Sequence, residues 1–189
     1  MSKRAFRIVG LGAVIALLGV ASFALAGGGK NHVKGNLTGY QENPDVSTAA
    51  TGTFEADIVD GDTKISYELA YSGLEGNILM SHIHFGKRGV NGGISLWLCG
   101  TGAPGTGLAG PAGTQSCPAS GSGTITGTLV AANVVGPEGQ GIAAGEFAEI
   151  VAAIRAGHAY ANVHSSKVPS GEIRAQVRDK GKDDKKKDG

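Results

Sequence analysis

Glycine accounts for 33 of the 189 residues and divides the chain into short segments in which apolar and polar side chains alternate. In the segment 52–59, GTFEADIV, this alternation places Phe54 and Ile58 on the same face. The segment 63–74, TKISYELAYSGL, repeats the alternation after the turn sequence Asp-Gly-Asp. A period of two residues is typical of a β-strand with one buried face, and glycine favours tight turns. The pattern therefore predicts antiparallel strands joined by short connections.

The rest of the chain repeats this pattern with one exception. Further strands are predicted over 36–40, 78–86, 92–99, 121–135, 158–164 and 171–178. The exception is the segment 145–156, where Phe147, Ile150, Val151 and Ile154 follow the spacing of one helical face, with Gly157 placed to end the helix. We therefore expect an all-β fold, an antiparallel Greek-key sandwich or barrel of seven to eight strands with one short helix (about 145–156).

The first 26 residues have the features of a signal peptide. Three basic residues precede an apolar run, and Ala-Leu-Ala at 24–26 offers a cleavage site of small residues. A retained N-terminal membrane anchor is the alternative interpretation. With cleavage, the expected organisation is a signal peptide (1–26), a flexible segment (27–33), one domain (34–178) and a disordered charged tail (179–189), in a secreted or periplasmic protein with no membrane span after cleavage.

Net charge and cysteine content restrict the kinds of partner that the protein can bind and the compartment in which it works. Residues 27–178 contain nine basic and twelve acidic side chains, a net charge of −3, which argues against a nucleic-acid partner. The two cysteines, Cys99 and Cys117, flank a segment rich in glycine. In an exported protein this pair predicts a disulfide. A pair of thiolate metal ligands is the alternative, although no Cys-x-x-Cys spacing supports it.

Two of the five histidines lie one residue apart in LMSHIHFGKRGVNGGI (79–94), and a third lies in YANVHSSKVPSGEIRAQV (160–177). Strand alternation puts His82 and His84 on one face, and an antiparallel sheet can bring His164 beside them. Neutral imidazole suits copper and zinc, so one ion held by His82, His84 and His164 is one hypothesis. The second layer of contacts would then comprise Asn162, Glu172 and Arg174. The alternative is a hydrogen-bond network of these same residues that joins the strand ends without metal.

The remaining polar residues carry no catalytic assignment. His32 falls in the segment expected to be flexible, and His158 is placed to cap the helix end. The sequence contains no Gly-x-Ser-x-Gly, His-Glu-x-x-His or Walker motif. We therefore assign no catalytic residue and expect a protein that is not an enzyme.

Three blocks of the sequence resemble the CHRD domain, a module named for its occurrence in chordin and widespread in exported bacterial proteins. They are LTGYQENP with TAATGTFEA, LEGNILMSHIHFGKRGVNGGI, and GHAYANVHSSKVPSGEIRAQ. The resemblance covers about residues 34–178, and Ser81 and Ala175 depart from it where alanine and glycine are usual. It implies an exported binding or structural module whose protein or surface partner is unknown.

A looser likeness suggests a chemistry. His-Ile-His followed by Phe-Gly is similar to the His-Val-His strand of copper–zinc superoxide dismutases, in which both histidines ligate copper. NVHSSKVPSGEIR is similar to a later strand of those enzymes that supplies a third copper ligand, and Arg174 parallels their anion-guiding arginine. The bridging histidine and the zinc ligands of those enzymes are missing here. This leaves two alternatives to a metal-binding module: a copper-dependent, superoxide dismutase-like enzyme and a metal-free cell-surface interaction module.

Overall fold

The computed structural model describes residues 31–102 and 107–179, so the predicted signal peptide and residues 180–189 of the predicted tail lie outside the described residues. Eight strands form one antiparallel sheet in the order β5-β4-β7-β8-β1-β2-β3-β6. Their bounds are β1 His32–Thr38, β2 Thr51–Val59, β3 Lys64–Ser72, β4 Ile78–Phe85, β5 Ile94–Gly100, β6 Gly123–Leu129, β7 Ala159–Ser165 and β8 Ile173–Asp179. The all-β prediction is confirmed.

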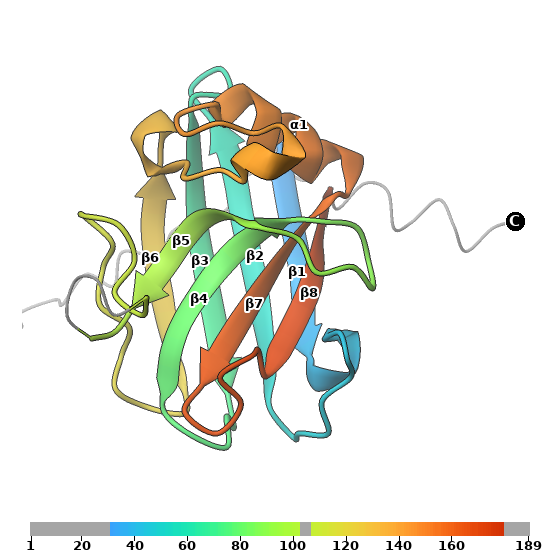
Figure 1. Cartoon of the computed structure of the whole chain (residues 1–189), viewed down its shortest axis with the longest axis vertical. Coiled ribbons are helices and arrows are strands. Elements are labelled where there is room, and N and C mark those ends of the chain that lie inside the picture. The colour runs from blue at the N-terminus through green and yellow to red at the C-terminus, as the bar shows by residue number, and fades with distance from the viewer. Residues whose placement is uncertain (1–30, 103–106, 180–189) are drawn as a thin grey trace, which may run out of the picture.

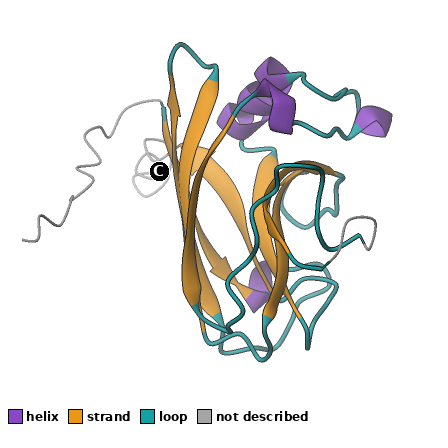
Figure 2. Cartoon of the chain, turned by 90° about the vertical axis from the view of Figure 1, so that its left-hand side faces the viewer, coloured by secondary structure: helices purple, strands orange, loops and turns teal. Residues whose placement is uncertain are grey.

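The sheet curls into two layers that nearly close a barrel. Strands β5, β4, β7 and β8 lie in front of β1, β2, β3 and β6 in Figure 1, and Figure 2 shows the two layers from the side. The two edge strands approach each other on one side, where Val135, which follows β6, donates its backbone N–H to the Ser95 carbonyl of β5 at 3.0 Å. Such closure protects strand edges that would otherwise present free backbone groups.

The core lies between the layers and explains the alternation in the sequence. Alternate residues of the strands point inward, and most of them are buried. Removing their apolar surface from water stabilises the fold by roughly 25 cal/mol per Å². The inward residues include Phe54, Ile58, Ile65 and Leu69 from one layer, and Ile83, Val163, Ile173 and Val177 from the other.

One α-helix, α1 (Phe147–Ala156), occurs among the described residues, at one end of the layers (Figure 1). It begins two residues later than expected. The four residues of the predicted apolar face are buried together with Ala153, and Gly157 ends the helix in a left-handed conformation with φ of 74°. Short 3-10 turns occupy η1 (Gly39–Gln41), η2 (Ala131–Asn133) and η3 (Glu138–Gln140).

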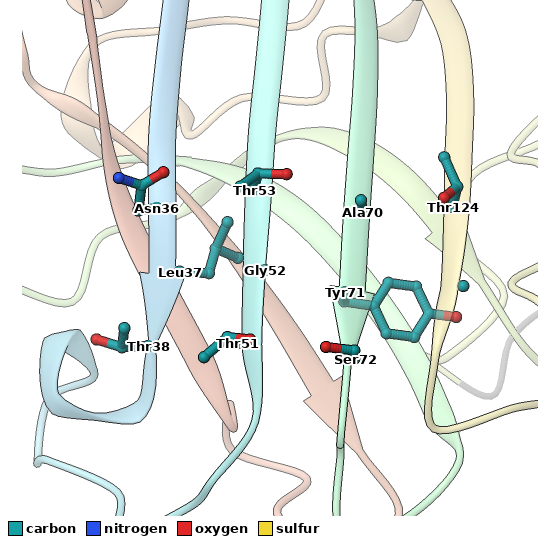
Figure 3. A pocket seen from close by; sticks show the side chains of 11 residues that line it. Asn36, Leu37, Thr38, Thr51, Gly52, Thr53, Ala70, Tyr71, Ser72 and Thr124 are labelled. Carbon is teal, nitrogen blue, oxygen red and sulfur yellow. The ribbon is translucent and has the colours of Figure 1, made fainter.

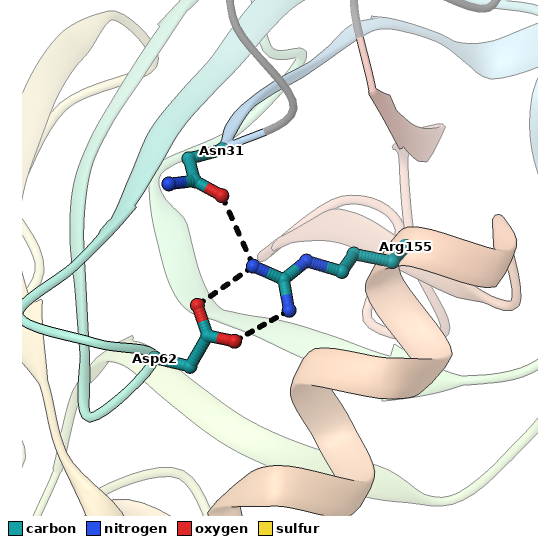
Figure 4. A network of polar contacts seen from close by, with 3 residues as sticks. All are labelled: Asn31, Asp62 and Arg155. Carbon is teal, nitrogen blue, oxygen red and sulfur yellow. Dashed lines mark hydrogen bonds and ion pairs between the residues drawn. The ribbon is translucent and has the colours of Figure 1, made fainter.

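A polar network attaches α1 to the β2–β3 hairpin. The hairpin turn holds Asp60, Gly61 and Asp62 at positive φ, a conformation that aspartate and glycine tolerate better than most residues. Arg155 of α1 donates two hydrogen bonds to the Asp62 carboxylate, at 2.6 and 2.7 Å, and one to the Asn31 side chain at 3.0 Å (Figure 4). The helix end, the hairpin and the start of β1 are therefore joined.

Some boundaries differ from those expected. Strand β1 begins at His32, so the end of the segment 27–33, expected to be flexible, belongs to the sheet. His32 is buried there, and its Nδ1 lies 2.9 Å from Asp57 Oδ1 on β2. The strand expected over 121–135 ends at Leu129, because the Asn133 side chain accepts the Val130 backbone N–H at 2.9 Å and the chain turns through η2.

The cysteine pair bears on the compartment. Cys99 and Cys117 lie at disulfide-bonding distance, which supports the predicted bond. Within the described ranges, every helix is too short or too polar to cross a bilayer.

Candidate three-histidine site

Two neighbouring strands bring the three predicted histidines together. On β4, His82 and His84 point to the same face, as strand alternation requires, and β7 pairs antiparallel with β4 so that Met80 faces His164. Each histidine offers one ring nitrogen, and these three nitrogens all lie within 4.8 Å of one another. The exposed fractions are 1% for His82, 8% for His84 and 7% for His164, so the site is buried.

Two backbone carbonyls determine which ring nitrogen of His84 and His164 carries the proton. The Nδ1 of His84 lies 2.9 Å from the Gly92 carbonyl oxygen, and the Nδ1 of His164 lies 2.9 Å from that of Pro169. A carbonyl only accepts hydrogen bonds, so each neutral ring carries its proton on Nδ1 and has a lone pair on Nε2. Both Nε2 atoms are buried and have no hydrogen-bond partner among the described residues.

His82 lies between the other two rings. Its ring centroid is 5.3 Å from that of His84 and 5.0 Å from that of His164. Both of its ring nitrogens are buried, and neither has a hydrogen-bond partner within the described part of the chain. Buried polar atoms are normally paired. Three imidazoles with unpaired lone pairs at one point could hold a metal ion.

Burial keeps the three imidazoles neutral. It lowers the pKa of His82 to about 2, with further lowering from the neighbouring His164 and His84. Burial also lowers the pKa of His84 to about 4, and it lowers the pKa of His164. Metal ions bind the neutral form of imidazole, so these three rings could coordinate an ion at ordinary pH.

An aromatic stack fixes the His84 ring from the other side. The Tyr160 ring on β7 lies parallel to that of His84, with centroids 4.6 Å apart and an interplanar angle of 2°. The Arg174 guanidinium, from β8, covers the Tyr160 ring at 3.4 Å. Since β4 and β8 flank β7 on opposite sides, His84, Tyr160 and Arg174 form one layered stack across three strands.

The connection between β4 and β5 covers this polar face of the sheet. Arg174 donates to the carbonyls of Val90 and Lys87 at 2.8 and 3.2 Å, and to the Asn91 side chain at 3.2 Å. The Tyr160 hydroxyl accepts the Gly92 backbone N–H at 3.1 Å. The face that strand alternation marks as polar is therefore covered by a loop, and the core covers the other face, so all seven residues of β7 are buried.

Of the three residues expected to surround the histidines, Asn162 lies next to the cluster, and Glu172 and Arg174 make their contacts elsewhere. Asn162 faces His82 across the β4–β7 pair and Arg174 across the β7–β8 pair. Glu172 is fully buried, but its Oε1 accepts hydrogen bonds from the Thr48 hydroxyl and the Glu75 backbone N–H, at 2.8 and 2.9 Å. Glu172 therefore joins two loops, and Arg174 acts on His84 through Tyr160.

Sequence reasoning missed two neighbours of the cluster. Trp97 on β5 faces His82, with ring centroids 4.1 Å apart. Glu42, which follows the strand predicted over 36–40, is 8% exposed, and burial raises its pKa to about 7 despite the nearby positive charge of Arg174. A period of two residues within the strand predicted over 158–164 puts Tyr160 on the same face as His164, but no local pattern indicates the loop that contains Glu42.

A surface hollow lies on the other layer of the sheet. A depression of about 500 Å³ on the β1-β2-β3-β6 layer is lined by hydroxyl and small side chains, among them Thr38, Thr53, Ser72 and Thr124 (Figure 3). Its lining comes from the layer opposite β4 and β7, so it is separate from the histidines. In the described residues, it contains no cluster of metal-ligating side chains.

Taken together, these observations define a class: an eight-stranded antiparallel β domain with a buried cluster of three neutral histidines that could hold a metal ion. The family model for the CHRD domain matches residues 33–177, and the chain belongs to that family. Neither a comparison with curated proteins nor one with solved structures gave a match.

Proposed function

We propose that this CHRD protein is an exported binding module that holds one copper or zinc ion through His82, His84 and His164. The observation that carries the proposal is the convergence of three neutral imidazole nitrogens within 4.8 Å. Two of these rings present Nε2 because a backbone carbonyl binds the opposite nitrogen, which is the arrangement that orients histidine ligands in metal sites. Soft or borderline ions that prefer nitrogen ligands fit this donor set.

The location outside the cytoplasm rests on the signal-like first 26 residues and on the cysteine pair at disulfide distance. An ion at this position would join β4 to β7 and stiffen the face covered by the loop between β4 and β5. The domain would then present that loop and its neighbours as a rigid surface to a protein or cell-surface partner. The family assignment supports a role in binding or structure.

Metal stoichiometry of the purified protein tests the proposal. After loading with copper or zinc and removal of the excess, we expect one ion per chain, and we expect its loss in His82→Ala and in His164→Ala. His158→Ala is the matched control, because His158 is exposed and lies outside the cluster. A parent protein that retains neither metal would contradict the proposal and favour a metal-free interaction module.

A further inference from the structure

Asn162 has a buried side-chain oxygen with no hydrogen-bond partner of good geometry among the described residues. The residue is 4% exposed, and its backbone carbonyl already accepts the Ser81 hydroxyl at 2.6 Å. Its side-chain Oδ1, in contrast, has no hydrogen-bond partner within residues 31–102 and 107–179. A buried amide oxygen normally has a donor. The unpaired acceptor therefore indicates a ligand with a proton to donate.

The orientation of the amide directs this oxygen toward the histidines. Asn162 Nδ2 and Glu42 Oε1 both lie beside Gly171, within 3.2 Å of the position that a Cβ there would occupy, and the Asn162 side chain is among the neighbours that interact with the Glu42 carboxyl. This orientation is the favourable one, since the nitrogen donates and the carboxylate accepts. Oδ1 lies on the opposite side of the amide. Two cluster members are next to the Asn162 side chain: His84, with which it interacts, and His82, which it faces across the β4–β7 pair.

The cluster itself leaves a coordination position open. In the described part of the chain, the cluster contains three residues of the types that ligate metals, and all three are histidines. Sites with three protein ligands keep a position for an exchangeable fourth ligand, whereas structural zinc sites use four protein ligands. An acceptor beside such a position suits water or hydroxide, each of which has a proton to donate.

We propose that Asn162 holds an exchangeable water or hydroxide on the ion bound by the three histidines, with Glu42 positioning the amide. The site is then an open centre that admits small protic molecules and small anions. This inference rests on the proposed function, because it requires the ion.

Copper-loaded protein provides the test. Pulsed electron paramagnetic resonance in H2O and in D2O should show exchangeable protons coupled to the copper of the parent protein. Azide should then displace this water and produce a charge-transfer band. Because azide cannot donate a hydrogen bond to Asn162, we expect it to bind about tenfold more tightly to Asn162→Leu than to the parent, the equivalent of one hydrogen bond of about 1.4 kcal/mol.

Two further variants keep the experiment decisive. Glu42→Ala leaves Asn162 in place and should shift azide affinity in the same direction by about threefold. Asn36→Leu changes an exposed asparagine on β1 and should leave azide affinity unchanged. One bound copper with neither exchangeable protons nor an azide band would overturn the open centre alone. Equal azide affinity in the parent and Asn162→Leu would overturn the role of Asn162, and failure of the parent to bind copper would overturn both proposals.

Discussion

The Trp97 indole lies almost perpendicular to the His82 imidazole, with ring centroids 4.1 Å apart and an interplanar angle of 83°. Trp97 is the only tryptophan in the chain, so its fluorescence reports on this one contact. The loop connecting β5 and β6 supports the indole from another direction, because a Cβ on Gly110 would lie 2.8 Å from two of its ring carbons. The proposed site thus contains its own optical probe.

Copper binding should quench this fluorescence, because a paramagnetic, redox-active ion at the cluster would lie next to the indole. We expect quenching to saturate at one equivalent of Cu²⁺, and Zn²⁺ to displace the copper and restore emission. The measurement is a fluorescence titration of the parent, with His164→Ala as a variant that leaves the Trp97–His82 contact intact. Quenching of equal depth and affinity in that variant would place the copper elsewhere.

The metal-free protein should show fixed tautomers at two histidines. The carbonyls of Gly92 and Pro169 each require a proton on Nδ1 of the facing ring, so we expect the Nδ1–H form at both His84 and His164. Two-bond nitrogen–proton correlation spectra distinguish the two tautomers. The exposed His158 provides a reference for an imidazole outside the cluster. An Nε2–H form at either cluster position would remove that ring from the proposed ligand set.

Acidification should destabilise the metal-free protein through the cluster. In the unfolded chain the His82 imidazole is exposed to water and takes up its proton at the ordinary histidine pKa of 6.5, whereas burial lowers its pKa in the folded protein to about 2. The unfolded state therefore binds more protons below pH 6.5, and stability is lost as the pH falls. For His82 alone, we expect a loss of about 3 kcal/mol between pH 7 and pH 4.5.

Glu42 acts in the opposite direction over the same range, because burial raises its folded pKa to about 7 and acidification then stabilises the folded state. The informative quantity is therefore the difference in unfolding free energy between the parent and His82→Gln at each pH, from which the contribution of Glu42 cancels. That difference should narrow toward acid pH. A constant difference would show that His82 is not held neutral by burial.

The ring of Tyr160 should contribute more than its hydroxyl to the unfolding free energy and to metal affinity. Tyr160→Phe keeps the stack between His84 and Arg174 and loses the contact with Gly92, so we expect a cost of about 1 kcal/mol in unfolding free energy. Tyr160→Leu removes the ring and should cost about 3 kcal/mol. Since His84 would then lose its parallel support, metal affinity should fall in the leucine variant but not in the phenylalanine variant. Equal metal affinity in the phenylalanine and leucine variants would show that the stack does not position His84 as a ligand.

Removing the cysteine pair should affect stability without affecting the metal. The bond between Cys99 and Cys117 spans 18 positions. A crosslink of this length lowers the chain entropy of the unfolded state and so stabilises the folded protein by about 3 kcal/mol. We expect the double variant Cys99→Ala/Cys117→Ala to lose about that much in denaturant unfolding. It should still bind one ion, because the proposed ligands are all histidines. Loss of the ion in a double variant that still folds would favour the alternative in which the two cysteines are thiolate metal ligands.

Much of the fold was predictable because the relevant signals are local. The alternation around Phe54 and Ile58 predicted β2, and the spacing of Ile150 and Ile154 predicted α1. Similarly, a period of two residues was sufficient to place His82 and His84 on one face. The start of β1 at His32 was missed, because its short pattern becomes clear only when Asp57 and its neighbours on β2 lie alongside.

The amino-acid sequence by itself determined which side chains share a face of each strand, since the pleat of a β-strand repeats every two residues whatever the surroundings. Only the tertiary structure decided that β7 pairs with β4, and therefore that His164 meets a pair of histidines some eighty positions earlier. It also decided that the loop between β4 and β5 buries the cluster, and that Glu42 and Trp97 lie beside it. Strand pairing and loop cover depend on contacts between distant residues, and those contacts create the low-polarity surroundings that keep the imidazoles neutral.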